Sequence, residues 1–476
     1  MGDAPTPDPQ QAPKPSSATP GRPGLVAFHV LAKPIGPVCN LDCQYCFYLH
    51  KTRFFPEGER YRMSDEVLER FVRSYIESQD APEVNFAWQG GEPTLLGVDF
   101  FRRAVALQRD FAPPGKTVQN AFQTNGILLD DEWCAFFKEH DFLVGLSLDG
   151  PREIHDKYRV DKHGAPTFEK VMAALRLLQK HQVRVNSLTC VNRYSGSRGA
   201  EVYRFLRDEA GFEHLQFIPV VEQVAFETNA PGVRGKWGQI PFCPSKMVSV
   251  PTFPTFPGRD PRLLVTPWTV LPEQFGRFLC AVFDEWVRHD VGRVFVQHLE
   301  VALALVLGLP SPLCVFARAC GQALAIEHDG TLFSCDHFVY PEYRLGNVKE
   351  QGLREMAQSA FQRSFGLDKS AKLPGTCRRC EFLALCFGEC PKNRLLFGPG
   401  GEAGLNYLCP GLKIYFAHVT PVLAAMAREL RAGRPAGNVM LALREAEEAK
   451  AGRAGGALLR GAKRHPAGAR GKRRPR

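Results

Sequence analysis

The chain has 476 residues, 44% of them hydrophobic and 23% charged, a composition typical of folded proteins at a length that allows two or more domains. These values exclude a fibrous protein and a wholly disordered one. The apolar runs are shorter than the roughly 18–20 residues that a membrane-spanning helix needs, and the first residues lack the apolar core of a secretory signal. We therefore expect a cytoplasmic protein with no membrane partner.

The net charge of +10 belongs to one end of the chain. Residues 449–476 carry ten Lys and Arg and no Asp or Glu, so the rest of the chain balances to zero. We expect this tail to be a disordered, solvated extension. Because the folded body has no excess of positive charge, we expect no nucleic-acid partner for it.

Residues 1–23 contain seven prolines among Ser, Ala and Gln, and we expect them to form a disordered leader. From residue 24 to about 230, short apolar runs alternate with helical patterns. One helix is predicted after Ser64, which can cap it, and another after Thr167. The predicted strands are 25–33, 84–88, 117–124, 142–148, 184–190 and 214–219.

This alternation predicts a parallel sheet with helices packed outside it. Six strand–helix units, fewer than a closed eight-stranded barrel has, predict an α/β fold in the form of an open, partial (β/α)6 barrel. On such a sheet the chemistry lies at the carboxyl ends of the strands. The first predicted strand ends shortly before three closely spaced cysteines, which marks the first loop as a candidate site.

The second half of the chain changes character. Residues 231–309 are expected to connect two domains, with an irregular Pro-, Gly- and Phe-rich stretch followed by helices at 272–289 and about 297–307. Residues 310–415 form a cysteine-rich module with too few apolar runs for a large core of its own, so bound metal would supply folding energy. A helical segment at 416–448 precedes the basic tail.

Fifteen cysteines are many for a chain without an export signal, and in a reducing compartment clustered cysteines more often bind metal than form disulfides. Cys39, Cys43 and Cys46 share one loop, at spacings that can hold three corners of a cubic iron–sulfur cluster. The fourth iron would then be open to another ligand. A structural zinc ion would need a fourth protein ligand, for which His50 is a poor candidate.

A larger group of cysteines lies in the module. A zinc ribbon over residues 377–390 is an alternative explanation for part of it. Outside both groups, Cys134, Cys190 and Cys280 are expected to be small core residues, and Cys243 is assigned no role. The group comprises Cys314, Cys320, Cys335, Cys377, Cys380, Cys386, Cys390 and Cys409.

The Cys39/Cys43/Cys46 loop resembles the signature of the radical S-adenosyl-L-methionine (SAM) enzymes. Three further motifs lie where the partial barrel of that family has them: Gly90-Gly91-Glu92-Pro93, Gln123-Thr124-Asn125-Gly126 and Ser147-Leu148-Asp149-Gly150-Pro151, the last followed by Arg159. The resemblance implies a 4Fe–4S cluster on the three cysteines, with SAM on the open iron. It also implies the residues that contact SAM: Gly90, Gly91 and Glu92 at its amino group, Ser147, Arg159 at its carboxylate, and Tyr45 packed on the cofactor.

The eight cysteines of the module resemble the SPASM domain, which carries two auxiliary 4Fe–4S clusters. The interleaved ligation of that domain implies one cluster on Cys314, Cys320, Cys335 and Cys390. It implies the other on Cys377, Cys380, Cys386 and Cys409. Full cysteine ligation suits electron transfer rather than substrate binding. The resemblance thus implies three 4Fe–4S clusters in all.

Residues 320–347 and 215–222 further resemble the anaerobic sulfatase-maturating enzymes, and the resemblance extends from about residue 25 to 416. It implies that the chain oxidises a Cys or Ser of an unfolded or nascent sulfatase polypeptide to formylglycine. A deoxyadenosyl radical from SAM would take hydrogen from the β-carbon, and Asp336, matching the catalytic aspartate of the family, would take the proton. The auxiliary clusters would accept the electron, and a flavodoxin- or ferredoxin-like donor would reduce the clusters.

Two other functions remain open at this point. One is a radical SAM enzyme that builds a thioether or carbon–carbon crosslink in another peptide, although residues 1–23 are too short and polar for the extra peptide-binding domain that such enzymes often carry. The other is a non-catalytic iron–sulfur redox sensor. A sensor would not convert SAM to 5′-deoxyadenosine under reducing conditions, which separates it from both enzymes.

Overall fold

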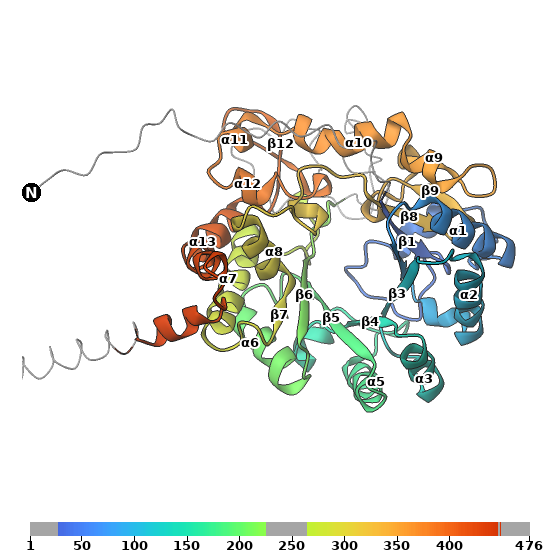
Figure 1. Ribbon diagram of the computed structural model, residues 1–476, viewed down its shortest axis with the longest axis horizontal. Helices are drawn as coiled ribbons and strands as arrows, with labels where there is room; N and C mark the ends of the chain where they lie inside the picture. The colour runs from blue at the N-terminus through green and yellow to red at the C-terminus, as the bar shows by residue number, and fades with distance from the viewer. Residues whose placement is uncertain (1–26, 225–263, 446–447, 449–476) are drawn as a thin grey trace, which may run out of the picture.

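A computed structural model describes residues 27–224, 264–445 and 448. The predicted leader, the basic tail, most of the irregular stretch and Cys243 lie outside these residues. Within them, one ten-stranded sheet runs through the molecule in the order β10-β9-β8-β1-β2-β3-β4-β5-β6-β7, with helices along its outer side (Figure 1). No helix in the described part of the chain is long and apolar enough to cross a membrane.

The first six strands are parallel neighbours in chain order, as the sequence predicts. The first of them begins later than predicted, because Gln79 and Tyr75 side chains occupy the backbone groups of Phe28. A two-residue strand, β7, extends the sheet beyond β6. The strands are β1 His29–Lys33, β2 Glu83–Trp88, β3 Thr117–Thr124, β4 Leu143–Ser147, β5 Arg184–Val191, β6 His214–Pro219 and β7 Phe295–Val296.

Helices connect these strands on the outside of the sheet (Figure 1). The Ser64 side chain caps the first of them by accepting a hydrogen bond from the Val67 N–H, as predicted. Short helical turns, η2 Leu49–Phe54, η3 Pro93–Leu96 and η4 Phe205–Glu209, lie in the connections. The helices are α1 Asp65–Ser78, α2 Val98–Phe111, α3 Asp131–Glu139, α4 Arg152–His155, α5 Phe168–Lys180 and α6 Gly199–Arg204.

An aromatic core fills the space between the sheet and these helices. Phe101 of α2 is fully buried and contacts rings on two strands. Its ring centroid lies 5.5 Å from that of Trp88 on β2 and 4.9 Å from that of Phe122 on β3. Rings of this size bury the largest apolar areas of any side chains. The barrel is therefore stabilised chiefly by burial of its own hydrophobic residues.

Two long helices close the open side of the barrel next to β6. α7 Pro272–His289 has the predicted bounds, and α13 Cys409–Arg431 packs against it. Their backbones touch at two glycines: a Cβ on Gly411 would lie 1.8 Å from the Pro272 carbonyl oxygen. α8 Gln297–Val306 also packs on α13.

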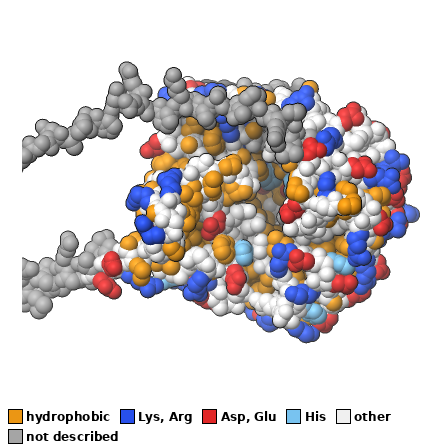
Figure 2. Space-filling model, viewed as in Figure 1, with side chains coloured by type: hydrophobic (Ala, Val, Ile, Leu, Met, Phe, Trp, Pro, Cys, Tyr) orange, Lys and Arg blue, Asp and Glu red, His pale blue; other side chains and the backbone are white. Residues whose placement is uncertain are grey.

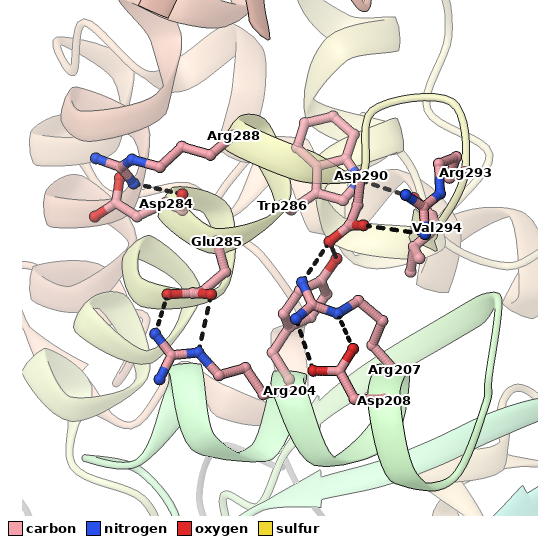
Figure 3. A network of polar contacts seen from close by, with 11 residues as sticks. Arg204, Arg207, Asp208, Asp284, Glu285, Trp286, Arg288, Asp290, Arg293 and Val294 are labelled. Atoms are coloured by element: carbon pink, nitrogen blue, oxygen red, sulfur yellow. Dashed lines mark hydrogen bonds and ion pairs between the residues drawn. The ribbon is translucent and has the colours of Figure 1, made fainter. Parts of the chain in front are cut away.

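An ion-pair network holds α7 to the end of α6 (Figure 3). The Arg204 guanidinium donates a hydrogen bond to each of the two carboxylate oxygens of Glu285. Arg207 and the Tyr203 hydroxyl both donate to Asp290, at 2.7 and 2.8 Å, and the Asp290 side chain is 2% exposed. A buried carboxylate is tolerated because these donors satisfy it, so this cluster is structural.

The cysteine-rich module continues the barrel sheet instead of forming a separate body. β8 pairs in parallel with β1, from His29 opposite Ala323 to Lys33 opposite Glu327. This pairing places β8 directly beside β1 in the sheet. Its elements are η6 Cys314–Phe316, β8 Ala323–Glu327, β9 Thr331–Phe333, η7 Asp336–Phe338, η8 Pro341–Tyr343, β10 Arg344–Asn347, α9 Leu353–Ala357, α10 Ala360–Ala371, α11 Gly375–Arg378, α12 Leu383–Cys386, η9 Pro391–Asn393, β11 Leu396–Phe397 and β12 Ala403–Leu405.

Candidate active site

The predicted site residues gather at the carboxyl ends of the barrel strands, under the module. Figure 2 shows a hollow near the centre of one face of the molecule, with hydrophobic side chains beside it. The barrel contributes the ends of β1 to β5, and the module contributes η7 with Asp336. This is where a parallel sheet is expected to carry its chemistry.

The Cys39/Cys43/Cys46 loop is fastened on both sides. The backbone N–H groups of Gly91 and Glu92 donate to the carbonyl oxygens of Gly36 and Val38, at 2.8 and 2.9 Å. On the other side, Asp42 and Gln44 donate to the backbone of residues 158–160. The loop is thus held between the end of β2 and the segment that carries Arg159.

Gly91 is required for this arrangement. A Cβ at Gly91 would lie 1.9 Å from the carbonyl oxygen of Val38, closer than any two such atoms can approach. Gly90 has a φ of +132°, a backbone angle that residues with a side chain rarely adopt. The two glycines therefore allow the cysteine loop to lie directly against the end of β2.

The three thiols of the loop are half-buried. The pKa of Cys39 and of Cys43 is raised to about 12, chiefly by burial, and the neighbouring Cys46 thiol contributes to this rise. A bound metal ion reverses this tendency, because it stabilises the thiolate. The loop therefore carries three thiols whose charges influence one another.

Glu92 is fully engaged within the protein. Its carboxylate accepts hydrogen bonds from the hydroxyls of Thr94 and Thr124, at 2.7 and 2.8 Å, and from the Asn125 N–H, at 2.7 Å. The Asn125 side chain in turn donates to Asn40 in the cysteine loop, at 2.7 Å. The Glu92 side chain thus joins the ends of β2 and β3 to the loop, and its contact with SAM stays a prediction.

Arg159 and Tyr45 meet at Asp149, a residue that the sequence reasoning gave no role. The Tyr45 hydroxyl donates to Asp149 at 2.5 Å, and the Arg159 Nε lies 3.1 Å from the same oxygen. The half-buried Cys190 thiol lies 3.8 Å from the Arg159 guanidinium. Ser147 lies half-buried at the end of β4. The sequence signal for Asp149 was its place inside the Ser-Leu-Asp-Gly-Pro motif.

Asp336 forms an ion pair that crosses from the module to the barrel. Its Oδ1 lies 2.5 Å from Nζ of Lys33, the last residue of β1. Burial on its own raises the pKa of Asp336, but the positive charge of Lys33 and its neighbours outweighs burial and leaves the pKa below its ordinary value. Asp336 is therefore an ionised carboxylate at neutral pH.

The sequence reasoning missed Lys33. Its side chain is only 1% exposed, and its ammonium group also donates to the Gln89 side chain at 3.2 Å and lies 3.9 Å above the Tyr48 ring. The available signal was a lysine at the end of an otherwise apolar strand, since a buried charge requires a partner.

Tyr48 and Glu327 complete the surroundings of Lys33. The Tyr48 hydroxyl donates to the buried Glu327 at 2.5 Å. Burial raises the pKa of Tyr48 well above its ordinary value, and the nearby Glu327 carboxylate raises it further. The Tyr48 phenol therefore stays protonated and cannot serve as a base.

The structure brings the eight module cysteines together in the two groups that the resemblance implies. Burial raises the pKa of Cys390 well above its ordinary value, and among its neighbours the thiols of Cys335, Cys320 and Cys314 raise it further. The other four thiols line one cavity, together with apolar side chains that include Phe382 and Leu412. Those four are Cys377, Cys380, Cys386 and Cys409.

Every cysteine in the described part of the chain is a free thiol. Cys134 is buried in the barrel core and Cys280 packs partly buried against it, as predicted. Among the described residues, no three His, Cys, Asp or Glu side chains lie close enough together to hold a single metal ion.

Comparison with known families identifies two parts of the chain. Residues 34–206 match the radical SAM superfamily, and residues 314–381 match the iron–sulfur cluster-binding SPASM domain. Both matches fall inside the predicted domains at 24–230 and 310–415, whose outer boundaries stay predictions. The predicted fold class, a partial barrel followed by a SPASM module, is confirmed.

A serine-type anaerobic sulfatase-maturating enzyme of Bacteroides thetaiotaomicron is 42% identical to this chain, over 90% of the chain and 98% of that enzyme. The chain belongs to the family of anaerobic sulfatase-maturating enzymes. The serine-type relative from Klebsiella aerogenes is 36% identical, over 87% of the chain and 90% of the relative. A cysteine-type relative from Clostridium perfringens is 31% identical, over 84% of the chain and 99% of the relative.

Solved structures agree with this family assignment. The structure of anSMEcpe with bound AdoMet, which is SAM, has 31% identity and a TM-score of 0.69, and the match covers 84% of this chain and 99% of that one. The same protein has been solved with AdoMet and a peptide named Cp18Cys, at a TM-score of 0.69. This chain is thus a radical SAM enzyme of the sulfatase-maturating family, and its cofactors are SAM and iron–sulfur clusters.

Proposed function

We propose that this chain oxidises a serine of an unfolded or nascent sulfatase polypeptide to formylglycine. The observation that carries the choice of serine is the identity to named relatives, which is 42% for a serine-type enzyme and 31% for a cysteine-type one. Both types share the chemistry, so the preference concerns the target side chain and not the reaction class.

The residues at the carboxyl ends of the strands fit the cofactors of the family. Three thiols share one loop, and that loop rests on a glycine whose Cβ would collide with it. When bound there, SAM on a 4Fe–4S cluster supplies a deoxyadenosyl radical that takes a hydrogen atom from the β-carbon of the target. Three groups of cysteines support three clusters, with Cys39, Cys43 and Cys46 holding the SAM-binding one.

The chain's own residues orient the cofactor and exclude water. The flexible backbone of Gly90 and Gly91 allows close approach of the SAM amino group. Arg159, buried beside Asp149, offers a guanidinium that suits a carboxylate. Ser147 and Tyr45 lie on the neighbouring strand end and in the cysteine loop, where they contact the cofactor.

Asp336 takes the proton of the target hydroxyl. Its carboxylate is ionised and is held at the boundary between barrel and module by Lys33. A positioned base of this kind contributes about 10²–10⁴-fold in rate. The two groups of module cysteines would hold the auxiliary clusters, which would supply an acceptor for the electron.

The partners follow from this chemistry. The substrate is an unfolded or nascent sulfatase, because the target residue has to enter a site between barrel and module. A flavodoxin- or ferredoxin-like protein reduces the clusters, in the reducing cytoplasm where free thiols persist. No nucleic acid takes part, since the folded body carries no excess of basic residues.

The test uses anaerobically reconstituted protein with SAM, a strong reductant and two peptides that differ only in Ser or Cys at the target position. We expect the Ser peptide to lose the mass of two hydrogen atoms, with 5′-deoxyadenosine formed alongside. Aldehyde from the Cys peptide alone would overturn the serine preference. 5′-Deoxyadenosine without aldehyde from either peptide would indicate a crosslinking enzyme for another peptide, and no 5′-deoxyadenosine would indicate a redox sensor.

A further inference from the structure

Lys33 is a buried cation with an unusual set of neighbours. The residue is 0% exposed, and it ends β1, a strand in the centre of the sheet. A buried ammonium group is costly unless it is paired. Among the described residues, its anionic partner within ion-pair distance is Asp336, at 2.5 Å.

The two partners belong to different parts of the molecule. Lys33 ends β1 of the barrel, whereas Asp336 begins η7 of the module, about 300 residues later in the chain. Backbone pairing of β1 with β8 brings these segments together and ends at Lys33 opposite Glu327. Beyond that point, the Lys33–Asp336 ion pair is the contact that sets where the Asp336 carboxylate lies.

Two further groups, Gln89 and the Tyr48 ring, fix the Lys33 side chain. Gln89 accepts from its ammonium at 3.2 Å, and the Gln89 amide donates to Gln123 at 2.7 Å. The Tyr48 ring lies under the ammonium at 3.9 Å, and its hydroxyl is held by Glu327. A row of polar side chains across the ends of β1, β2 and β3 thus immobilises the ammonium group, so it can hold a carboxylate in one place.

We infer that Lys33 is the positioning residue for the catalytic base: it holds the Asp336 carboxylate where the target hydroxyl presents its proton. This inference rests on the proposed function. In the step concerned, the carbon radical left by hydrogen abstraction loses its hydroxyl proton to Asp336 and one electron to an iron–sulfur cluster of the module, and the C–O bond becomes C=O. Hydrogen abstraction comes earlier and does not need the base.

This order of events gives Lys33 a distinct signature. Without Lys33, hydrogen abstraction continues but the second half of the reaction fails, so 5′-deoxyadenosine accumulates without an equal amount of aldehyde. The informative quantity is the ratio of formylglycine to 5′-deoxyadenosine. A residue with only a structural role would lower both products together.

The experiment compares wild type with Lys33→Met and Asp336→Asn, each as the reconstituted holoenzyme with the Ser peptide. We expect both variants to lower the ratio by at least about tenfold, with peptide affinity unchanged. Lys116→Met is the matched control. The Lys116 ammonium also donates hydrogen bonds within the protein, to the Ile76 and Gln79 carbonyl oxygens, and lies far from the site. We expect this control to keep the wild-type ratio.

Stability provides an independent readout that does not depend on turnover. Asp336→Asn leaves the buried Lys33 ammonium without its partner, and Lys33→Met leaves the half-buried Asp336 carboxylate without its own, so both lower the melting temperature. The double variant Lys33→Met/Asp336→Asn removes both charges and recovers part of the loss. If Lys33→Met does not fold, Lys33→Gln, which keeps a donor near Asp336, replaces it and is expected to lower the ratio in the same direction.

A wild-type ratio in Lys33→Met or Lys33→Gln would overturn the inference, and so would additive losses of stability in the double variant. Failure of the proposed function looks different. In that case the wild type itself yields no aldehyde from the Ser peptide. If only the inference about Lys33 is wrong, the wild type yields aldehyde and the Lys33 variants keep the wild-type ratio.

Discussion

The barrel and the cysteine-rich module reach stability by different means. In the barrel, rings such as Trp88, Phe101 and Phe122 lie fully buried between sheet and helices. In the module, residues 314–409, four thiols line one cavity and polar side chains such as Glu389 and Lys369 are buried. A hydrophobic core folds the first region, and the second depends on what its thiols bind.

The difference also divides the chemistry. The barrel provides rigid strand ends, and these position the cysteine loop, Arg159 and Lys33. The module provides Asp336 and the two further groups of thiols. Because β8 pairs with β1, the region that depends on metal is fastened to the region that does not. The site at their boundary therefore requires both regions in place.

Removal of the clusters has the largest expected effect and tests this comparison directly. After chelation of iron under anaerobic conditions, we expect amide hydrogen exchange in residues 314–409 to accelerate at least ~100-fold, because the module loses the binding energy that folds it. Exchange in β2 to β5 should change little. Equal acceleration in both regions would show that the module and the barrel unfold as one unit.

Gly91→Ala should act on the cluster through the barrel. The added Cβ would lie 1.9 Å from the Val38 carbonyl oxygen, so the cysteine loop has to move. We expect a loss of more than about 4 kcal/mol in the free energy of unfolding and loss of the SAM-binding cluster, measured as iron content and 5′-deoxyadenosine formation. Gly115→Ala, where a Cβ meets nothing within 4 Å, is the control and should cost about 1 kcal/mol. Normal iron content in Gly91→Ala would contradict this account.

Phe101→Ala should weaken the barrel and leave the clusters alone. Truncation of a fully buried ring costs about 3–5 kcal/mol, and we expect the same loss with and without iron, measured by denaturant unfolding. A loss that disappears when iron is removed would mean that the barrel core and the clusters are coupled.

Ser64→Ala has the smallest expected effect. The Ser64 side chain caps α1 through the Val67 N–H at 3.2 Å, and removal of such a cap costs about 1 kcal/mol. We expect unchanged turnover and unchanged iron content. A drop in turnover larger than the drop in stability would place α1 in contact with the site.

Local patterns made most of the fold predictable. Ser64 and the apolar stripe that follows it gave α1, and the alternating runs gave six parallel strands. The continuation of the sheet into β8 was not predictable, because the pairing of residues about 300 apart leaves no local signal. For the same reason Lys33 was missed: its partner Asp336 lies in the module, and only the tertiary fold brings the two together.

The site was predictable where the residue spacing is itself the motif, as in the cysteine groups and the glycines. It was less predictable where a side chain has another task. Glu92 was expected at the cofactor, which stays a prediction, and the sequence did not show that its carboxylate also accepts from Thr94, Thr124 and Asn125. Cys190 was expected to be a small core residue, and its thiol lies 3.8 Å from the Arg159 guanidinium. The sequence pattern of a strand end does not encode which neighbours the Glu92 and Cys190 side chains contact.

The most direct test of the whole account is isotope transfer from a Ser peptide that carries deuterium on its target β-carbon. With the reconstituted enzyme, SAM and reductant, we predict deuterium in 5′-deoxyadenosine and an equal amount of formylglycine peptide. Aldehyde accompanied by unlabelled 5′-deoxyadenosine, or labelled 5′-deoxyadenosine with no aldehyde from the wild type, would contradict an active site that joins hydrogen abstraction in the barrel to proton removal by Asp336.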